Sequence, residues 1–293
     1  MATTEYNNET GNLMDLNQKV TPILWHGRIE RHLKWQNGKK HDGRLQIQGD
    51  TVENLELIDL HLEHVEWKGL KIKKLELIRC SFDQLNFSLS TALKSRFSEC
   101  YLSKCNLQAC DLSGAKLIQS KFDSCDLSQS NFSYGVIEES KWTDCTLDSS
   151  NLHGSDLRDV KFSHCRGFST NVSDSYAAGA EFNDCNFNQS DWSHFIGWDT
   201  RWTKVQLSKS NFFGSDLRHS IFKGCHIQEA NFEYCQIDDN WLERHKALAN
   251  LWIQKTYTES DTLPLALNRN LQERYRAIAR SEGKVNYLRR MTR

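Results

Sequence analysis

A five-residue period runs without interruption through about two thirds of this 293-residue chain. Between Ile47 and Leu242, every fifth residue is large and apolar at 36 of 40 positions, and no insertion or deletion shifts the phase. The exceptions are Ala92, Gly167, Ala177 and Gly197. A period of five matches neither the 3.6-residue turn of an α-helix nor the alternation of a straight strand. The chain must therefore run briefly extended and then turn a corner.

A longer period of twenty residues is superimposed on the short one. Aromatic centres recur at this spacing, and so do Asp and Asn residues that each precede an apolar centre. The two series are Phe82, Phe122, Trp142, Phe162, Phe182, Trp202 and Phe222, and Asp111, Asn131, Asn151, Asn171, Asp191, Asn211 and Asn231. Four pentapeptides therefore make one coil, and like residues stack above like. We expect the Asp and Asn column to bind turn amides rather than to supply catalytic carboxylates.

A second restricted position lies two residues before each apolar centre. From Cys80 to Cys235 it holds a small residue in 28 of 32 cases, and all ten cysteines fall in this phase. Such regularity indicates packing, because a metal site has no reason to follow it and the sequence has no Cys-x-x-Cys. Cys100, Cys105 and Cys110 occupy successive corners of one coil, but no inward histidine completes a ligand set. We predict buried free thiols in a reducing compartment, with no metal and no cofactor.

Several stretches resemble the pentapeptide-repeat family, among them Cys110-Asp111-Leu112-Ser113-Gly114 and Ser215-Asp216-Leu217-Arg218-His219. The resemblance implies a right-handed quadrilateral β-helix. We therefore predict an all-β solenoid of about ten coils over residues 45–239, roughly 45 to 50 Å long at the usual strand separation. From Leu45 to Leu77 the small position holds Leu or Val except at Asp50, so we expect the first coils to be wider or more strand-like.

The rod exposes strand edges at its two ends and so needs caps. Residues 21–44 are expected to form an N-terminal β cap, because Arg28 to Trp35 alternates loosely and Asn37-Gly38 offers a hairpin turn. Residues 240–293 are expected to form a C-terminal helical cap. There Leu271, Tyr275 and Ile278 lie on one helical stripe, which would pack on the rod or pair two copies into a homodimer.

The termini bear on where the protein resides. Residues 1–20 are expected to be a disordered leader, since they are rich in Ser, Thr, Asn and Glu. They lack a basic start followed by an apolar run, and the chain has no run of eighteen apolar residues. No secretory signal and no membrane span are predicted, and the expected location is the cytoplasm.

Breaks in the repeat are the candidate binding surface. Around the positions where the apolar centre is lost, large side chains appear at irregular phases. The candidate partner-binding residues are Phe168, Tyr176, Ile196 and Trp198. One interpretation is local repacking, with Phe195 or Phe168 filling the space left by a glycine; the other is a raised apolar surface for a partner.

A basic stripe is a second candidate. Lys121, Lys141, Lys161 and Arg201 recur at one outward position, interrupted by Glu181. This stripe would attract phosphate or an acidic protein, although such a pattern is also typical of a solvated face. The chain as a whole carries a net charge of −1, which excludes a uniformly basic nucleic-acid binder.

The resemblance implies an interaction protein rather than an enzyme. The histidines are scattered at outward positions, and the sequence shows no Ser-His-Asp arrangement and no glycine-rich phosphate loop. Our first hypothesis is a rigid protein-binding scaffold or adaptor. The best-understood branch of the family resembles double-stranded DNA and binds DNA gyrase or topoisomerase IV, so a type II topoisomerase is an alternative partner. A second alternative is an exported bacterial effector.

Overall fold

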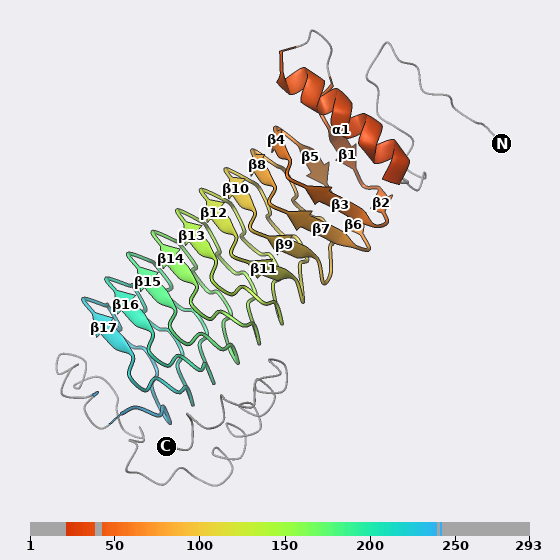
Figure 1. Ribbon diagram of the computed structural model, residues 1–293. Helices are drawn as coiled ribbons and strands as arrows, with labels where there is room; N and C mark the ends of the chain where they lie inside the picture. The colour runs from red at the N-terminus through yellow and green to blue at the C-terminus, as the bar shows by residue number, and fades with distance from the viewer. Residues whose placement is uncertain (1–21, 39–42, 239–240, 242–293) are drawn as a thin grey trace.

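The computed structural model describes residues 22–38, 43–238 and 241 of the chain. They form a rod of stacked coils with a single helix, α1 (Pro22–Gln36), at the N-terminal end (Figure 1). The predicted all-β solenoid is confirmed. The expected leader, the C-terminal cap and the stripe of Leu271, Tyr275 and Ile278 lie outside the described residues.

Each of the four sides of the rod, here called faces 1 to 4 in chain order, carries a parallel sheet. Face 1 holds nine strands: β4 (His61–Glu63), β8 (Ser81–Asp83), β10 (Tyr101–Ser103), β12 (Lys121–Asp123), β13 (Lys141–Thr143), β14 (Lys161–Ser163), β15 (Glu181–Asn183), β16 (Arg201–Thr203) and β17 (Ile221–Lys223). Face 2 holds β1 (Gln46–Gln48) and β5 (Glu66–Lys68), and face 3 holds β2 (Thr51–Val52) and β6 (Lys71–Ile72). Face 4 holds β3 (Leu55–Ile58), β7 (Leu75–Ile78), β9 (Arg96–Ser98) and β11 (Lys116–Ile118).

Every strand pair joins residues twenty apart. Phe122 pairs with Trp142, and Trp142 pairs with Phe162. Where the later coils have no strand on faces 2, 3 and 4, single bridges keep the same spacing, as between Asn131 and Asn151. This register confirms that four pentapeptides make one coil. It also confirms that the first coils are more strand-like, since strands occur on all four faces only between residues 46 and 78.

The interior is filled by the two inward positions of each pentapeptide. The apolar centres and nearly all of the small residues that precede them are buried. Aromatic rings stack from coil to coil: the ring centroids of Phe182 and Trp202 are 4.0 Å apart, and those of Trp202 and Phe222 are 5.3 Å apart with nearly parallel planes. Such continuous ring contact adds to the free energy gained by burying apolar area.

The corner of each pentapeptide is a residue with positive φ. From Gly49 to Tyr234, every fifth residue except Lys74 lies in the left-handed region, and thirty of these residues are not glycine. The left-handed conformation costs a non-glycine residue roughly 1 to 2 kcal/mol. Its cost is offset because the amide at the corner donates to a carbonyl oxygen one coil further along, as Ser149 N does to Phe168 O at 2.8 Å. A chain with two prolines and fifteen glycines turns its corners in this way.

The N-terminal region differs from the prediction. Residues 22–36 form an α-helix, so the expected β cap is wrong. Ile29, His32 and Leu33 turn inward with helical spacing, which outweighs the loose alternation. Asn37-Gly38 ends the helix rather than making a hairpin: Gly38 has φ of 82° and its amide donates to the carbonyl oxygen of Trp35 at 2.9 Å.

Helix α1 contacts the first edge of the nine-stranded sheet. The Gln36 side chain accepts a hydrogen bond from the amide of Glu63 and donates one to the carbonyl oxygen of His61, both at 3.3 Å. His32 is buried, and its Nδ1 accepts the amide hydrogen of Leu45 at 2.9 Å. The helix therefore binds backbone groups that a free sheet edge would leave open to pairing with another chain.

We expect a pH-dependent loss of stability at this helix. Burial lowers the pKa of His32 below its usual 6.5. As the pH falls through 6.5, His32 of the unfolded chain takes up a proton that the buried side chain resists, so the free energy of unfolding decreases. Well above pH 6.5, His32 is neutral in both states and contributes no pH dependence. Urea unfolding between pH 5 and about 7.5 measures the slope. His32→Asn keeps an acceptor without titrating, so its slope should be smaller, and parallel slopes would contradict this account.

We also expect the corners to reject β-branched side chains. Ser149 is exposed and has φ of 56°, a conformation that is strongly unfavourable for valine. Ser149→Val should lower the free energy of unfolding by about 1 to 2 kcal/mol, whereas Ser149→Gly should change it by less than about 1 kcal/mol. Gln108→Val, at an exposed position that is not a corner, is the control. Equal effects of the two valine substitutions in denaturant unfolding would refute the corner as the cause.

Candidate partner-binding face

The two glycines at apolar centres are packing devices. A Cβ atom on Gly197 would lie 2.3 Å from the ring of Phe195, and one on Gly167 would lie 2.3 Å from the ring of Phe187. Each ring therefore occupies the space that the missing side chain leaves. Filling by Phe195 is confirmed, whereas filling by Phe168 is wrong, because Phe168 points outward and is 37% exposed.

The four candidate partner-binding residues do not lie together. Phe168 belongs to the pentapeptide centred on Gly167, on face 2. Tyr176, Ile196 and Trp198 belong to the pentapeptides centred on Ala177 and Gly197, which stack on face 4. Because these faces are two corners apart in a four-sided coil, Phe168 lies on the opposite side of the rod from the other three.

On face 4 a second layer of side chains covers the rod from outside. Tyr176 and Ile196 are buried, at 4% and 0% exposure, yet neither belongs to the interior hydrophobic cluster. Trp198 is partly exposed, and its indole meets the Tyr176 ring edge-on at a centroid distance of 6.1 Å. The irregular residues therefore form an apolar layer outside the wall of the rod.

Two arginines complete this layer. The guanidinium group of Arg158 lies 5.7 Å from the centroid of the Tyr176 ring, and that of Arg218 lies 5.3 Å from Trp198. An aspartate two residues earlier holds each arginine through its Nε and Nη2 atoms. Those of Arg218 lie 3.0 and 2.8 Å from the oxygens of Asp216. We call Arg158, Tyr176, Ile196, Trp198 and Arg218 the arginine–aromatic patch. Its rings are fixed by cation–π contacts and its cations by carboxylates.

Carboxylates outnumber cations on this face. Between residues 136 and 219, the outward and corner positions of face 4 carry six carboxylates and two arginines, a net charge of −4 with His219 neutral. Glu139, Asp159 and Asp199, here called the acidic rim, stand exposed along the corner between faces 4 and 1. Carboxylates therefore border the rings and guanidinium groups of the patch.

The basic stripe lies on face 1 as one column. Lys121, Lys141 and Lys161 are in register on β12, β13 and β14, followed by Glu181 and Arg201. Glu181 interrupts the column of cations. Its carboxylate oxygens lie 3.1 Å from Lys161 Nζ and 3.7 Å from Arg201 Nη1. Among the described residues, the uncompensated part of the stripe is Lys121 and Lys141.

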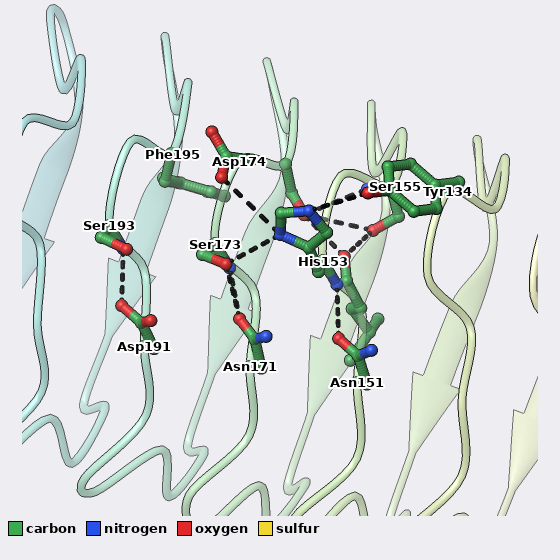
Figure 2. A network of polar contacts seen from close by, with 12 residues as sticks. Tyr134, Asn151, His153, Ser155, Asn171, Ser173, Asp174, Asp191, Ser193 and Phe195 are labelled. Atoms are coloured by element: carbon green, nitrogen blue, oxygen red, sulfur yellow. Dashed lines mark hydrogen bonds and ion pairs between the residues drawn. The ribbon is translucent and has the colours of Figure 1, made fainter.

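Sequence analysis missed a polar network on the ridge between faces 3 and 4. His153 Nε2 lies 3.1 Å from the hydroxyl of Tyr134, and its Nδ1 lies 2.9 Å from Ser173 Oγ and 3.6 Å from Asp174 (Figure 2). The Tyr134 side chain is 67% exposed and lies across Gly154, where a Cβ atom would be 2.8 Å from the ring. The sequence did contain a signal for this contact, because Gly154 stands twenty residues after Tyr134 and leaves room for its ring on the next coil. The network fixes an aromatic side chain at the edge of face 4.

The Asp and Asn column does what the sequence predicts. Asn151 Oδ1 accepts the amide hydrogen of His153 at 3.0 Å, and Asp191 Oδ1 accepts that of Ser193 at 3.0 Å (Figure 2). The Asn151 amide also reaches Asn131 Oδ1, one coil earlier, at 3.3 Å. These side chains accept hydrogen bonds from turn amides and stabilise the coils.

A protein-family model agrees with the five-residue repeat. Eight copies of the pentapeptide-repeat family model match residues 95–133 and 203–239. The chain is a pentapeptide-repeat protein. No curated protein sequence matches it significantly.

Solved structures similar to this pentapeptide-repeat protein include HetL and QnrB1. HetL, from the cyanobacterium Nostoc sp. strain PCC 7120, is described as a pentapeptide-repeat protein involved in heterocyst differentiation regulation. It is 16% identical over 73% of this chain and 97% of HetL, with a TM-score of 0.31. QnrB1 is described as a plasmid-mediated fluoroquinolone resistance protein, and it is 19% identical over 76% of this chain and 98% of QnrB1, with a TM-score of 0.32.

The thiols of this pentapeptide-repeat protein line its interior. Nine of the ten free cysteines are buried and Cys225 is partly buried. Most of their Sγ atoms donate to backbone carbonyls, as Cys165 does to Trp142 O at 3.2 Å. Burial raises the pKa of Cys100 to about 11 and shifts the pKa of Cys110 upward. Among the described residues, no group of three His, Cys, Asp or Glu side chains is placed to hold a metal ion.

No helix within residues 22–38, 43–238 and 241 is long and apolar enough to cross a membrane.

Proposed function

We propose that this pentapeptide-repeat protein is a non-enzymatic scaffold that binds a protein partner through the arginine–aromatic patch. The observation that carries the proposal is the outer layer on face 4, where Trp198 stands partly exposed over the buried Tyr176. A structural repeat alone does not require this layer, since the coils are closed without it. Tryptophan, tyrosine and arginine are also the side chains that most often dominate binding energy at protein interfaces.

The rigidity of the patch supports the same function. Arg158 is only 13% exposed and is held by Asp156 at 2.5 Å and by Glu138 at 3.4 Å. Side chains that are already fixed lose little conformational entropy when a partner binds. The ordered Tyr134 beside the patch would extend the contact area. A rod that presents preorganised side chains on one face suits a scaffold better than a catalyst.

The ten free thiols also fit a cytoplasmic scaffold. Cysteines stacked one coil apart, as Cys145 and Cys165 are, would be exposed to oxidation during folding in an oxidising compartment. We therefore propose that the protein works in the cytoplasm.

We expect Trp198→Ala to abolish partner capture without unfolding the rod. The substitution removes the partly exposed side chain of the outer layer and leaves the interior of the rod intact, so the free energy of unfolding should fall by only about 1 kcal/mol. The measurement is a quantitative pull-down with the full chain as bait, in a lysate of the source cells. Phe168→Ala is the matched control, because it removes an exposed aromatic side chain on the opposite face.

A partner of the patch should be retained by the wild type and by Phe168→Ala and lost by Trp198→Ala. Proteins captured equally by Trp198→Ala and Phe168→Ala would contradict the assignment of the patch. A collapse in stability of Trp198→Ala would show instead that Trp198 is structural.

A type II topoisomerase is our second candidate partner. The observation in its favour is the net charge of −4 on face 4, because a protein surface that replaces DNA on an enzyme must present carboxylates where DNA presents phosphates. The basic stripe on face 1 restricts this mimicry to one side of the rod.

The topoisomerase proposal predicts an effect on DNA gyrase. Titrating the purified protein into a supercoiling assay, with and without a quinolone, should inhibit supercoiling or protect the enzyme from the drug at micromolar or lower concentration. The variant Asp159→Asn with Asp199→Asn should weaken the effect, since it removes two exposed carboxylates of face 4. Unchanged supercoiling in the presence of folded protein would eliminate gyrase as the partner.

A further inference from the structure

The hydroxyl hydrogen of Ser173 has a fixed direction in the polar network between faces 3 and 4 (Figure 2). The backbone amide of Ser173 donates to Asn171 Oδ1 at 3.0 Å, and the Ser173 hydroxyl donates to the same oxygen at 2.7 Å. A serine hydroxyl has only one hydrogen. Ser173 Oγ therefore presents a lone pair to His153 Nδ1, which lies 2.9 Å away.

This direction sets the tautomer of His153. Its Nδ1 faces two acceptors, Ser173 Oγ at 2.9 Å and a carboxylate oxygen of Asp174 at 3.6 Å, so Nδ1 carries the ring hydrogen. A neutral imidazole has one N–H group, so Nε2 presents a lone pair. The Tyr134 hydroxyl lies 3.1 Å from Nε2 and donates its hydrogen there. The imidazole is thus oriented as a base toward the tyrosine.

The phenol ring is held in place while its hydroxyl remains accessible. The Tyr134 ring lies over Gly154, where a Cβ atom would be 2.8 Å from it, and meets the His153 ring edge-on at a centroid distance of 5.2 Å. Tyr134 is nevertheless 67% exposed. A hydroxyl within hydrogen-bond distance of a base, with a third group orienting that base, is the arrangement that activates a nucleophile.

We infer that the Tyr134 hydroxyl is a covalent modification site that accepts an acyl group from an activated ester or thioester, with His153 as its general base. This inference goes beyond the proposed function, because it needs no partner at the arginine–aromatic patch. It assigns one acyl group to each chain.

The step moves one proton and exchanges one bond. His153 Nε2 removes the hydroxyl hydrogen of Tyr134 as the phenolic oxygen bonds to the acyl carbon. The bond between that carbon and the oxygen or sulfur of the donor then breaks, and the leaving group departs with the electron pair. The proton on His153 passes to the leaving group or to water. The products are an ester of Tyr134 and a free alcohol or thiol.

Asp174 favours this chemistry over phosphoryl transfer. Its carboxylate lies 3.6 Å from His153 Nδ1, where it stabilises the imidazolium that forms as the proton is transferred. The same negative charge disfavours the approach of a phosphoryl donor, whose oxygens are also negative, whereas the carbonyl group of an ester or thioester is uncharged.

The test is acylation of the full-length protein by 4-nitrophenyl acetate at about pH 8, where an ordinary imidazole is neutral. Released 4-nitrophenolate is followed by absorbance, and peptide mass spectrometry measures the acetylation of each tyrosine over time. Tyr101 is the internal control, because it is 42% exposed and its hydroxyl lies 3.4 Å from a carboxylate oxygen of Asp123 rather than beside an imidazole.

We expect Tyr134 to be acetylated about a hundredfold faster than Tyr101, since a positioned general base contributes a factor of about this size. His153→Gln should lower the rate at Tyr134 about a hundredfold and leave the rate at Tyr101 unchanged. Tyr134→Phe should remove the fast release of nitrophenolate, which separates it from any reaction of the thiols. Urea unfolding verifies that both variants fold.

The wild type supplies a measurement that depends on no substitution. Because a proton is transferred to His153 as the bond forms, acetylation of Tyr134 should be slower in D2O than in H2O, and more so than acetylation of Tyr101. Equal rates at the two tyrosines, an unchanged rate at Tyr134 in folded His153→Gln, or equal solvent isotope effects at the two tyrosines would overturn the inference.

Discussion

The structure depends on one constraint: each coil must pair its backbone with the next coil at a spacing of twenty residues. All strand pairs and bridges follow this register, and it is kept by using one residue at each corner, with positive φ at every corner from Gly49 to Tyr234 except Lys74. An inserted residue would turn the inward positions of later pentapeptides toward solvent. The unbroken phase from Ile47 to Leu242 is the consequence of this geometry in the sequence.

The same register makes the rod modular. An unusual residue in one coil therefore stands out from the residues at the same position in the coils above and below it. On face 4 the coils centred on Ala177 and Gly197 have lost their large interior side chain. Phe195 fills the interior from the preceding position, and Tyr176, Ile196 and Trp198 gather outside. The defect is repaired inside the rod, and an additional layer of side chains lies outside it, so local repacking is confirmed. The partner-binding surface stays our proposal.

Charge is organised by the same columns. The same position on the same face recurs every twenty residues, so an excess of one sign at that position accumulates along one side of the rod. Glu181 neutralises part of the lysine column on face 1, while Asp159 and Asp199 remain exposed beside the patch on face 4. A net charge of −1 for the whole chain conceals this separation.

The sequence by itself determined the solenoid, the four-pentapeptide coil, the buried thiols and the Asp and Asn column, because each is a periodic pattern and the backbone register is periodic too. It also singled out Tyr176, Ile196 and Trp198 as departures from the period. Only the tertiary structure decided that Phe168 lies on the opposite side of the rod, that arginines cover the rings, and that Tyr134 contacts His153. These contacts depend on side-chain rotamers and on neighbours one coil away. The helix at residues 22–36 was not predicted because it lies outside the repeat. There the periodic pattern, from which the fold of the coils was predicted, is absent.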